Sequence, residues 1–258
     1  MGSSDSKDIY ILEKTFDYIL KDTDISLFGI MNKFNPDMKP INDYSTYLRT
    51  NFKKNSIMES YSKSEESNNQ IKYKYLADEI PHWIIPMYGF MGFMIPILLD
   101  MILSFEDIHI ALLSEIKKPF FDIHSENTFL HYCVIEHLRL FNIINMHPVR
   151  ETNVDLIIDN YKIKKGSEVL ILFSSLLRNP KLFEHPNSFI PQRWSEKTIE
   201  EQYIVFGVGA QRCPSIHFTP FIYKNYIFNL LSRFEFKTKY GQYDRDDLPF
   251  INAFQLTF

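Results

Sequence analysis

One of the chain's two cysteines, Cys213, lies in a glycine-rich segment, FGVGAQRCPSIHFTPF (206–221). Gly207 and Gly209 can take backbone conformations that are closed to other residues, and they let a flat ligand approach the backbone closely. A helix is predicted after the cysteine, and the positive end of its dipole favours a thiolate. Thiolate is the form of cysteine that ligates iron. The segment therefore permits a metal-ligating thiolate, whereas for a cysteine taken alone a small buried apolar side chain behind a turn is the usual interpretation.

A second pair of residues that could do chemistry, Glu136 and Arg139, lies in a segment (106–145) that the apolar spacing predicts to be helical. The residues that form its apolar face are Leu130, Val134, Leu138 and Phe141. Glu136 and Arg139 are three positions apart, so they are neighbours on the helix surface. From the spacing alone, they form an ordinary solvated ion pair that contributes little to stability.

The elements that must position these residues change in kind after residue 149. VDLIIDNYKIKKGSEVLILF (154–173) predicts short strands separated by turns at DN and KKG. The next segment, NPKLFEHPNSFIPQRW (179–194), is irregular and punctuated by prolines. A final helix is predicted to reach about Phe234, with Thr219 as its N-cap and Pro220 as its first residue.

Four segments, taken in order, resemble the cytochrome P450 family. FGVGAQRCPS is similar to the family's haem-binding loop, F-x-x-G-x-R-x-C-x-G, and HYCVIEHLRLF to its helix bearing E-x-x-R. YKIKKGSEVLILFSSLLRNPKLFEHPNSFIPQRW resembles its strand pair and the proline-rich stretch that ends in P-E-R-F/W. WIIPMYGFMGFMIPILLDMIL occupies the place of its long central helix. The resemblance covers residues 129–236 and, more loosely, residues 83–128.

The resemblance implies a mainly α fold with a small β-sheet, a truncated cytochrome P450-like haem-thiolate fold. It implies haem b (iron protoporphyrin IX) as cofactor, with Cys213 as the axial ligand of the iron. The other residues that it implies are Phe206, Gly209, Gln211 and Arg150 near the haem, Glu136, Arg139 and Arg193 as a buried salt-bridged triad, and Gly89, Gly92 and Met94 at the distal face. The implied partners are an apolar small-molecule substrate and an electron-donating reductase.

The chain departs from the family pattern at three places. Gln211 stands where the family usually has arginine, so a haem propionate loses a charge-assisted partner there, although the amide can still donate a hydrogen bond. Ser215 replaces the glycine two residues after the cysteine. Residues 83–99 contain no Thr, Ser, Asp or Glu, so the acid–alcohol pair with which family monooxygenases deliver protons is missing. Some branches of the family without that pair isomerise or dehydrate peroxides.

We expect a single domain over residues 1–258: an irregular, helical N-terminal part (1–52), a polar loop or linker (53–74), and the elements above over 83–258. The net charge of −4 gives no basic surface for nucleic acid. Two distant cysteines exclude a disulfide framework and favour an intracellular setting. Membrane association stays open, because residues 83–99 are nearly long enough to span a bilayer and Gly2 lies in an N-myristoylation pattern.

Three functional hypotheses follow. The first is a haem-thiolate enzyme, either a monooxygenase or a peroxide-rearranging isomerase. The second is a degenerate haem-binding protein of the same type without turnover. The third is a membrane-inserted protein that is not an enzyme. No pair of histidines has the spacing of a competing metal site.

Overall fold

The computed structural model describes residues 46, 91–92, 94–141, 149–236, 243–246 and 248. The chain divides into two units, Met1–Gly92 and Phe93–Phe258, and almost all of the described residues belong to the second. The predicted polar linker (53–74) and Gly89 lie outside the described residues. The prediction of a single domain over residues 1–258 therefore stays a prediction.

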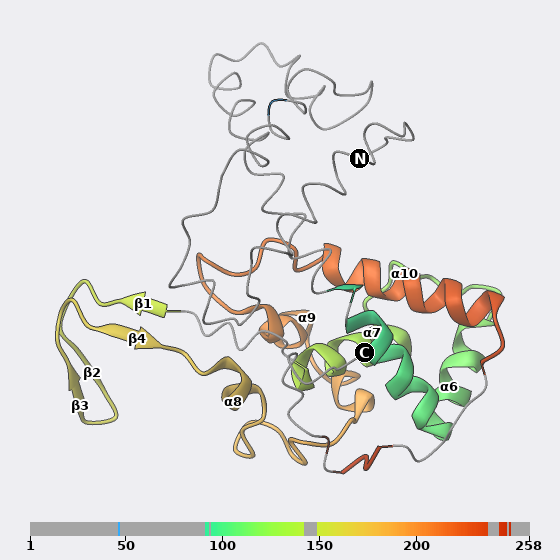
Figure 1. The fold of residues 1–258 in the computed structure, drawn as a ribbon, viewed down its shortest axis with the longest axis horizontal. Helices are drawn as coiled ribbons and strands as arrows, with labels where there is room; N and C mark the ends of the chain where they lie inside the picture. The colour runs from blue at the N-terminus through green and yellow to red at the C-terminus, as the bar shows by residue number, and fades with distance from the viewer. Residues whose placement is uncertain are drawn as a thin grey trace. The chain divides into compact units, whose positions relative to one another are not determined.

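The described part of the second unit is mainly helical, with short strands in the middle of the chain (Figure 1). Residues 94–104 form a helix. The helices that follow are α6 (Glu106–Ile116), α7 (Phe129–Leu140), α8 (Phe173–Leu177), α9 (Ile199–Gln202) and α10 (Phe218–Arg233), with 3₁₀ turns at η1 (Pro191–Trp194) and η2 (Tyr203–Phe206). The strands are β1 (Val149–Glu151), β2 (Leu156–Ile158), β3 (Tyr161–Ile163) and β4 (Glu168–Leu170). The predicted fold class, mainly α with a small β-sheet, is confirmed.

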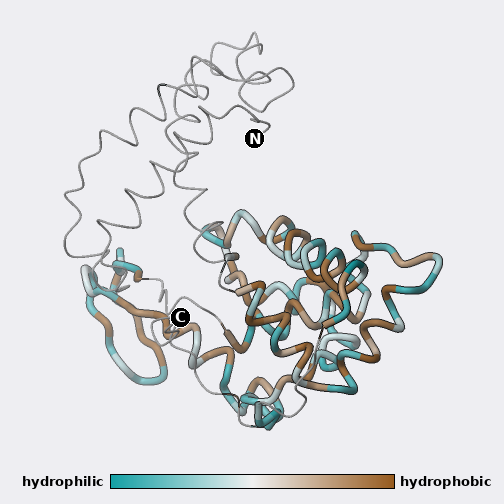
Figure 2. Tube along the Cα trace, turned by 45° about the vertical axis from the view of Figure 1, so that its right-hand side comes forward, coloured by the Kyte–Doolittle hydropathy of each residue, from teal (hydrophilic) through white to brown (hydrophobic). Residues whose placement is uncertain are grey.

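Helix α7 lies at the centre of the helical part, where it packs against both α6 and α10 (Figure 1). Its N-cap is Thr128, whose hydroxyl accepts a hydrogen bond from the backbone N–H of His131 at 3.1 Å and so caps the first turn. Leu130, Val134 and Phe141 of the predicted apolar face are buried and Leu138 is partly buried, but the polar residues Glu136, His137 and Arg139 are buried as well. Helix α7 is therefore enclosed on nearly every side although its sequence is mixed. Figure 2 shows that apolar and polar residues are interspersed throughout the helical part.

The prediction of continuous helix over 106–145 is wrong between α6 and α7. Residues 117–128 form turns instead. Pro119 has no backbone N–H to donate to a helix. Further along, the Asp122 carboxylate accepts from the His124 backbone N–H at 2.9 Å, and the Ser125 hydroxyl accepts from that of Asn127 at 3.1 Å. These local side-chain bonds satisfy the backbone outside a helix and lead into the Thr128 cap.

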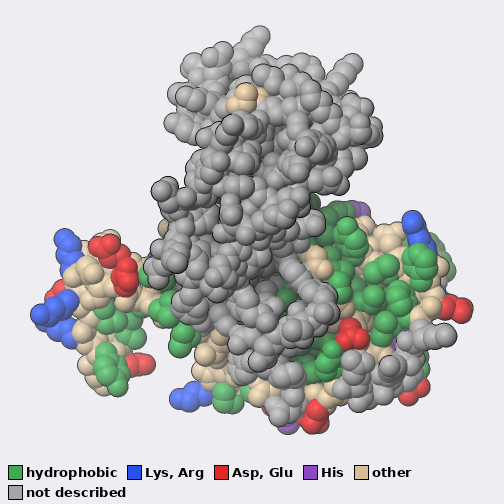
Figure 3. Space-filling view, viewed as in Figure 1, with side chains coloured by type: hydrophobic (Ala, Val, Ile, Leu, Met, Phe, Trp, Pro, Cys, Tyr) green, Lys and Arg blue, Asp and Glu red, His purple; other side chains and the backbone are tan. Residues whose placement is uncertain are grey.

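The strands form two antiparallel pairs, β1 with β4 and β2 with β3, in agreement with the predicted turns. Asp159 and Asn160 connect β2 to β3 with φ angles of 46° and 69°, the two positive values that a type I′ hairpin turn requires. Gly166, with φ 81°, supplies the turn before β4. Charged side chains of both signs are spread over the strand region, at the left in Figure 3, and Lys162 pairs there with Asp155.

In the part of the chain that the structure describes, no helix combines the length and the apolar character needed to cross a bilayer. The helix over 94–104 contributes to the core instead, with Leu98, Met101 and Ile102 almost fully buried. Most of the stretch 83–93 lies outside the described residues.

Two histidines on α7 are enclosed in this core. His137 packs between the rings of Phe141 and Tyr223, at centroid distances of 5.2 and 6.0 Å, and neither of its ring nitrogens has a hydrogen-bond partner in the described residues. The backbone of Met94 lies near the ring without reaching good hydrogen-bond geometry. Burial lowers the pKa of His137 to about 3 and that of His131 to about 4.

Acidification is therefore expected to destabilise the fold. Above the ordinary histidine pKa of about 6.5, both states hold these rings neutral. Below it, the two histidines bind protons in the unfolded state but not in the folded state. The free energy of unfolding therefore falls until the pH reaches the pKa of the folded state. The slope is about 1.4 kcal/mol per pH unit for each histidine. Urea unfolding from about pH 7.5 to about pH 4.5 measures it.

His137→Leu should reduce this slope by about 1.4 kcal/mol per pH unit, the contribution of one histidine. His185→Asn, at an exposed site, should leave the slope unchanged. An unaltered slope in His137→Leu would show that His137 is not held neutral in the folded state.

Candidate functional site

Cys213 ends a tight loop that starts at η2. The backbone N–H of Cys213 donates to the carbonyl of Phe206 at 3.0 Å and closes the loop. Gly207 and Gly209 have φ angles of 84° and 83°, in the left-handed region that side chains disfavour. A Cβ at Gly209 would meet nothing within 4 Å, so this glycine is required by the backbone conformation and not by a close neighbour.

The two cysteines of the chain differ in what they can do. Cys133, on α7, is fully buried, and burial raises the pKa of its thiol well above the ordinary value. A thiol in that position is inert packing. Cys213 is half-buried and belongs to no disulfide, so its sulfur can be reached from outside the loop. Only Cys213 therefore has the exposure that a metal ligand needs.

Both ends of the Cys213 loop are anchored in one apolar cluster. The cluster consists of Tyr132, Ile135, Leu177, Trp194, Tyr203, Val205 and Ile216, with Phe206 among the partly buried rings that pack against it. Tyr203 and Val205 precede the loop, and Ile216 follows it. Because α7 and η1 supply the other side of the cluster, the position of the loop depends on these two elements.

The Glu136 carboxylate lies beneath this cluster and accepts five hydrogen bonds while fully buried. Its Oε2 accepts from Arg139 Nε at 2.9 Å and from Trp194 Nε1 at 2.8 Å. Its Oε1 accepts from Arg139 Nη2 at 2.8 Å, from Arg193 Nε at 3.0 Å and from the backbone N–H of Ile190 at 3.1 Å. The structure thus brings Glu136, Arg139 and Arg193 together, and the interpretation of the first two as a solvated pair is wrong.

The guanidinium of Arg139 uses all five of its N–H donors. Two form the bidentate pair with Glu136. The other three donate to the backbone carbonyls of Leu177 at 2.8 Å, Pro186 at 2.7 Å and Ser188 at 3.2 Å. A buried charge is tolerable only when it is paired and hydrogen-bonded in this way.

Arg193 extends the network toward the surface. Its Nη1 donates to the carbonyl of Glu184 at 2.7 Å and its Nη2 to that of His185 at 3.2 Å. The two arginines therefore hold the irregular segment 184–188 against α7 through its backbone.

The helix after Cys213 starts earlier than predicted. Helix α10 begins at Phe218 with His217 as its N-cap, so Thr219 is its second residue and not the cap. The backbone N–H of Thr219 donates to the carbonyl of Ser215 at 2.8 Å, which extends helical hydrogen bonding toward the cysteine. Pro220 is accommodated in the first turn, where a missing N–H costs little.

The remaining predicted residues lie in different surroundings. Arg150 is exposed on β1 and donates to the carbonyl of Val149 at 2.9 Å, and Gln211 is exposed in the loop. Gly92 belongs to the first unit, so its position relative to Cys213 is not defined. Met94 is buried in the helix over 94–104. Of these residues, Gln211 alone belongs to the loop that ends at Cys213.

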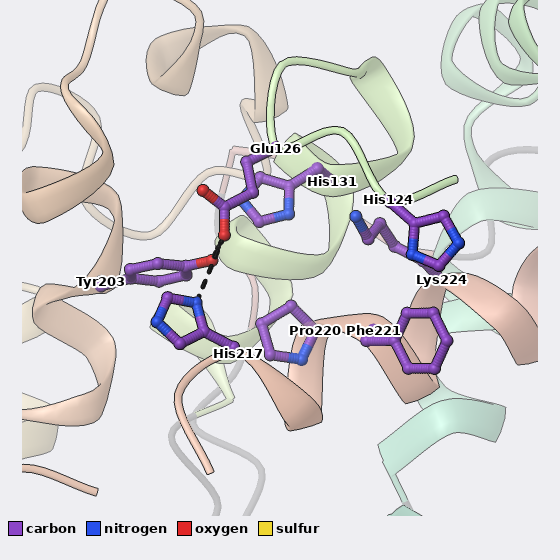
Figure 4. A pocket seen from close by; sticks show the side chains of 8 residues that line it. All are labelled: His124, Glu126, His131, Tyr203, His217, Pro220, Phe221 and Lys224. Carbon is purple, nitrogen blue, oxygen red and sulfur yellow. Dashed lines mark hydrogen bonds and ion pairs between the residues drawn. The ribbon is translucent and has the colours of Figure 1, made fainter. Parts of the chain in front are cut away.

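A pocket of about 230 Å³ lies between α7, η2 and α10, and sequence reasoning missed it (Figure 4). It is lined by His124, Glu126, His131, Tyr203, His217, Pro220, Phe221 and Lys224. The Glu126 carboxylate accepts from the hydroxyl of Tyr203 and lies 3.4 Å from Nδ1 of His217. His217 meets His124 and His131 there although it lies more than 80 residues further along the chain, and spacing along the chain cannot reveal that. No cluster of three or more metal-ligating side chains occurs among the described residues.

The residues around Cys213 fit a haem. Cys213 is half-buried on a closed loop, and residues 208–211 of that loop are exposed. Exposed Gln211 offers an amide donor to a propionate. No other side chain with a ligating atom appears among the loop residues 206–213.

Comparison with known proteins agrees with this arrangement. A family model described as Cytochrome P450 matches residues 105–254, more than half of the chain. Abscisic acid 8'-hydroxylase 4 of Arabidopsis thaliana is 31% identical over 135 residues, which are 52% of this chain and 29% of that protein. Mitochondrial cytochrome P450 11B3 of Rattus norvegicus is 36% identical over 75 residues, which are 27% of this chain and 15% of that protein.

Cytochrome P450 85A1 of Solanum lycopersicum is 34% identical over 112 residues, which are 41% of this chain and 24% of that protein. The chain spans less than a third of the length of each of these curated relatives.

Arg139→Lys should lower the free energy of unfolding by about 3–5 kcal/mol, because lysine cannot replace the five-donor fork and leaves Glu136 and several carbonyls unsatisfied. Arg212→Lys is the matched control: Arg212 pairs with exposed Glu200 at 2.9 Å, and its loss should cost less than about 1 kcal/mol. Urea unfolding at neutral pH compares the two. Equal costs would contradict the central role of the buried network.

Proposed function

The chain belongs to the cytochrome P450 family, and from that premise we propose that it is a haem-thiolate protein that acts as a monooxygenase on an apolar small molecule. Cys213 would ligate the iron, and the proposed cofactor is haem b. When bound, the haem supplies the activation of dioxygen, with electrons from a reductase. The protein's part is to hold the cofactor, shape the site and exclude water.

The observation that carries this proposal is the placement of the Cys213 thiol. It lies on a loop closed by its own backbone, half-buried, with both loop ends packed into the cluster on α7. The cluster in turn includes Trp194, whose indole N–H donates to Glu136. The loop that carries Cys213 is therefore connected to the buried pair of Glu136 and Arg139 through Trp194 and the apolar cluster.

The remaining residues take supporting roles in the proposal. Glu136, Arg139 and Arg193 would act as the structural triad of the proximal side. Gln211, and Arg150 more remotely, would donate hydrogen bonds to haem propionates. Phe206 would pack near the thiolate, and Gly209 would permit the turn. The segment around Gly89, Gly92 and Met94 would form the distal face.

A second candidate function is favoured by the composition of that distal segment. Residues 83–99 carry no hydroxyl side chain other than that of Tyr88 and no carboxylate, so the chain offers little there to move a proton to the reacting centre. A peroxide-rearranging isomerase, or a haem-binding protein without turnover, needs no such relay. The buried thioether of Met94 cannot donate a proton.

Reconstitution with haem tests the ligand assignment. The reduced protein under carbon monoxide should show the red-shifted Soret band of a thiolate-ligated haem, and Cys213→Ala should lose it because the ligating sulfur is gone. Cys133→Ala is the control, since that thiol is fully buried on α7, and it should keep the band. A protein that remains folded but binds no haem would contradict the proposal.

Turnover should depend on the source of oxidising equivalents. With NADPH, a reductase and 7-ethoxycoumarin as an apolar probe, we expect most of the NADPH consumed to appear as hydrogen peroxide rather than product, because residues 83–99 lack the acid–alcohol pair. The ratio of product formed to NADPH consumed measures this coupling. Tight coupling would overturn the inference about the missing relay, while conversion of an added hydroperoxide without reductase would favour the isomerase.

A further inference from the structure

The sulfur of Cys213 has one hydrogen-bond partner among the described residues, and it is a side chain. The Oγ of Ser215 lies 3.1 Å from Sγ of Cys213. The family pattern has glycine at this position, so the hydroxyl is a feature of this chain. Both side chains are half-buried, which reduces the competition from water for this bond.

The direction of the bond follows from the neighbouring residue. Thr219, one helical turn later, donates its hydroxyl to the Oγ of Ser215 at 3.2 Å. Ser215 then acts as the acceptor in that bond, and its own proton is left to point at the sulfur. A thiolate has no proton and can only accept, so Ser215 must be the donor whenever Cys213 is deprotonated.

The backbone fixes the geometry of this pair. The carbonyl of Ser215 accepts from the N–H of Thr219 at 2.8 Å, which places the two side chains on one face of the turn that leads into α10. The backbone N–H of Cys213 donates to the carbonyl of Phe206 and does not donate to the Cys213 sulfur. The hydroxyl is therefore the donor that the described residues provide for a negative charge on Cys213.

We propose that Ser215, oriented by Thr219, is a positioning residue that donates a hydrogen bond to the Cys213 thiolate and thereby sets the electron donation from sulfur to iron. The proposal rests on the proposed function, because it requires Cys213 to be the iron ligand. Hydrogen bonds to a ligating sulfur are one of the means by which a protein tunes the reduction potential of its iron. A donor to sulfur withdraws electron density, which weakens donation to ferric iron and makes the potential more positive.

The test measures the ferric/ferrous reduction potential of the haem-loaded protein by spectroelectrochemistry. Ser215→Ala should shift the potential to more negative values and raise the iron–sulfur stretching frequency in resonance Raman spectra. Ser215→Thr keeps the hydroxyl and should remain close to the unmodified protein. Thr219→Val should shift both quantities in the same direction as Ser215→Ala but less, because the Ser215 proton loses its orientation.

Ser195→Ala is the matched control, because its hydroxyl donates to the Gln192 carbonyl on an exposed turn and should change neither quantity. An unchanged potential and frequency in Ser215→Ala would overturn the proposal, as would equal shifts in Ser195→Ala. If Ser215→Ala fails to fold, the shift in Thr219→Val decides. Failure of the proposed function has a different signature, since the unmodified protein would then lack the thiolate band under carbon monoxide.

Discussion

The buried carboxylate of Glu136 is the interaction on which the described structure depends most. It is the only acceptor shared by Arg139, Arg193, Trp194 and the backbone of Ile190 in the described residues. Placing such a charge in the interior costs several kcal/mol unless its partners compensate for the lost water. Here five donors do so, two from Arg139 on the same helix and three from residues 190–194. The ion network therefore couples α7 to the irregular segment that follows the strands.

That coupling explains how a residue far from Cys213 in sequence can influence it. Trp194 belongs both to the network, through its indole N–H, and to the apolar cluster that holds Tyr203 and Ile216. The cluster fixes the two ends of the loop, and the loop closes on itself through Phe206 and Cys213. Positioning a reactive side chain within a fraction of an ångström requires such a supported surrounding.

Sequence patterns predicted the local features well. The DN turn, the strands on either side of it and the helix bearing Glu136 follow from turn chemistry and from apolar spacing. The patterns failed where burial is decided by distant parts of the chain. A Glu and an Arg three residues apart have the same spacing at the surface and in the core, and only the resemblance to a family indicated burial.

The pocket around His131 was not predictable for the same reason, since its lining comes from four separate segments. The start of α10 was misplaced because Thr and Pro are common at helix starts, and here they are its second and third residues. The break over 117–128 was missed because the apolar spacing was followed past Pro119, and the side-chain bonds to the backbone that complete the break do not change that spacing.

The way in which Arg139 and Arg193 hold the segment 184–188 has a consequence for how freely that segment can change. Their N–H groups reach the carbonyls of Glu184, His185, Pro186 and Ser188 and none of the side chains there. Every amino acid has a backbone carbonyl, so the arginines recognise the path of the chain and not its composition. Substitutions in this segment that keep its path leave the network intact, and the segment can accumulate such changes without loosening the helix beneath it.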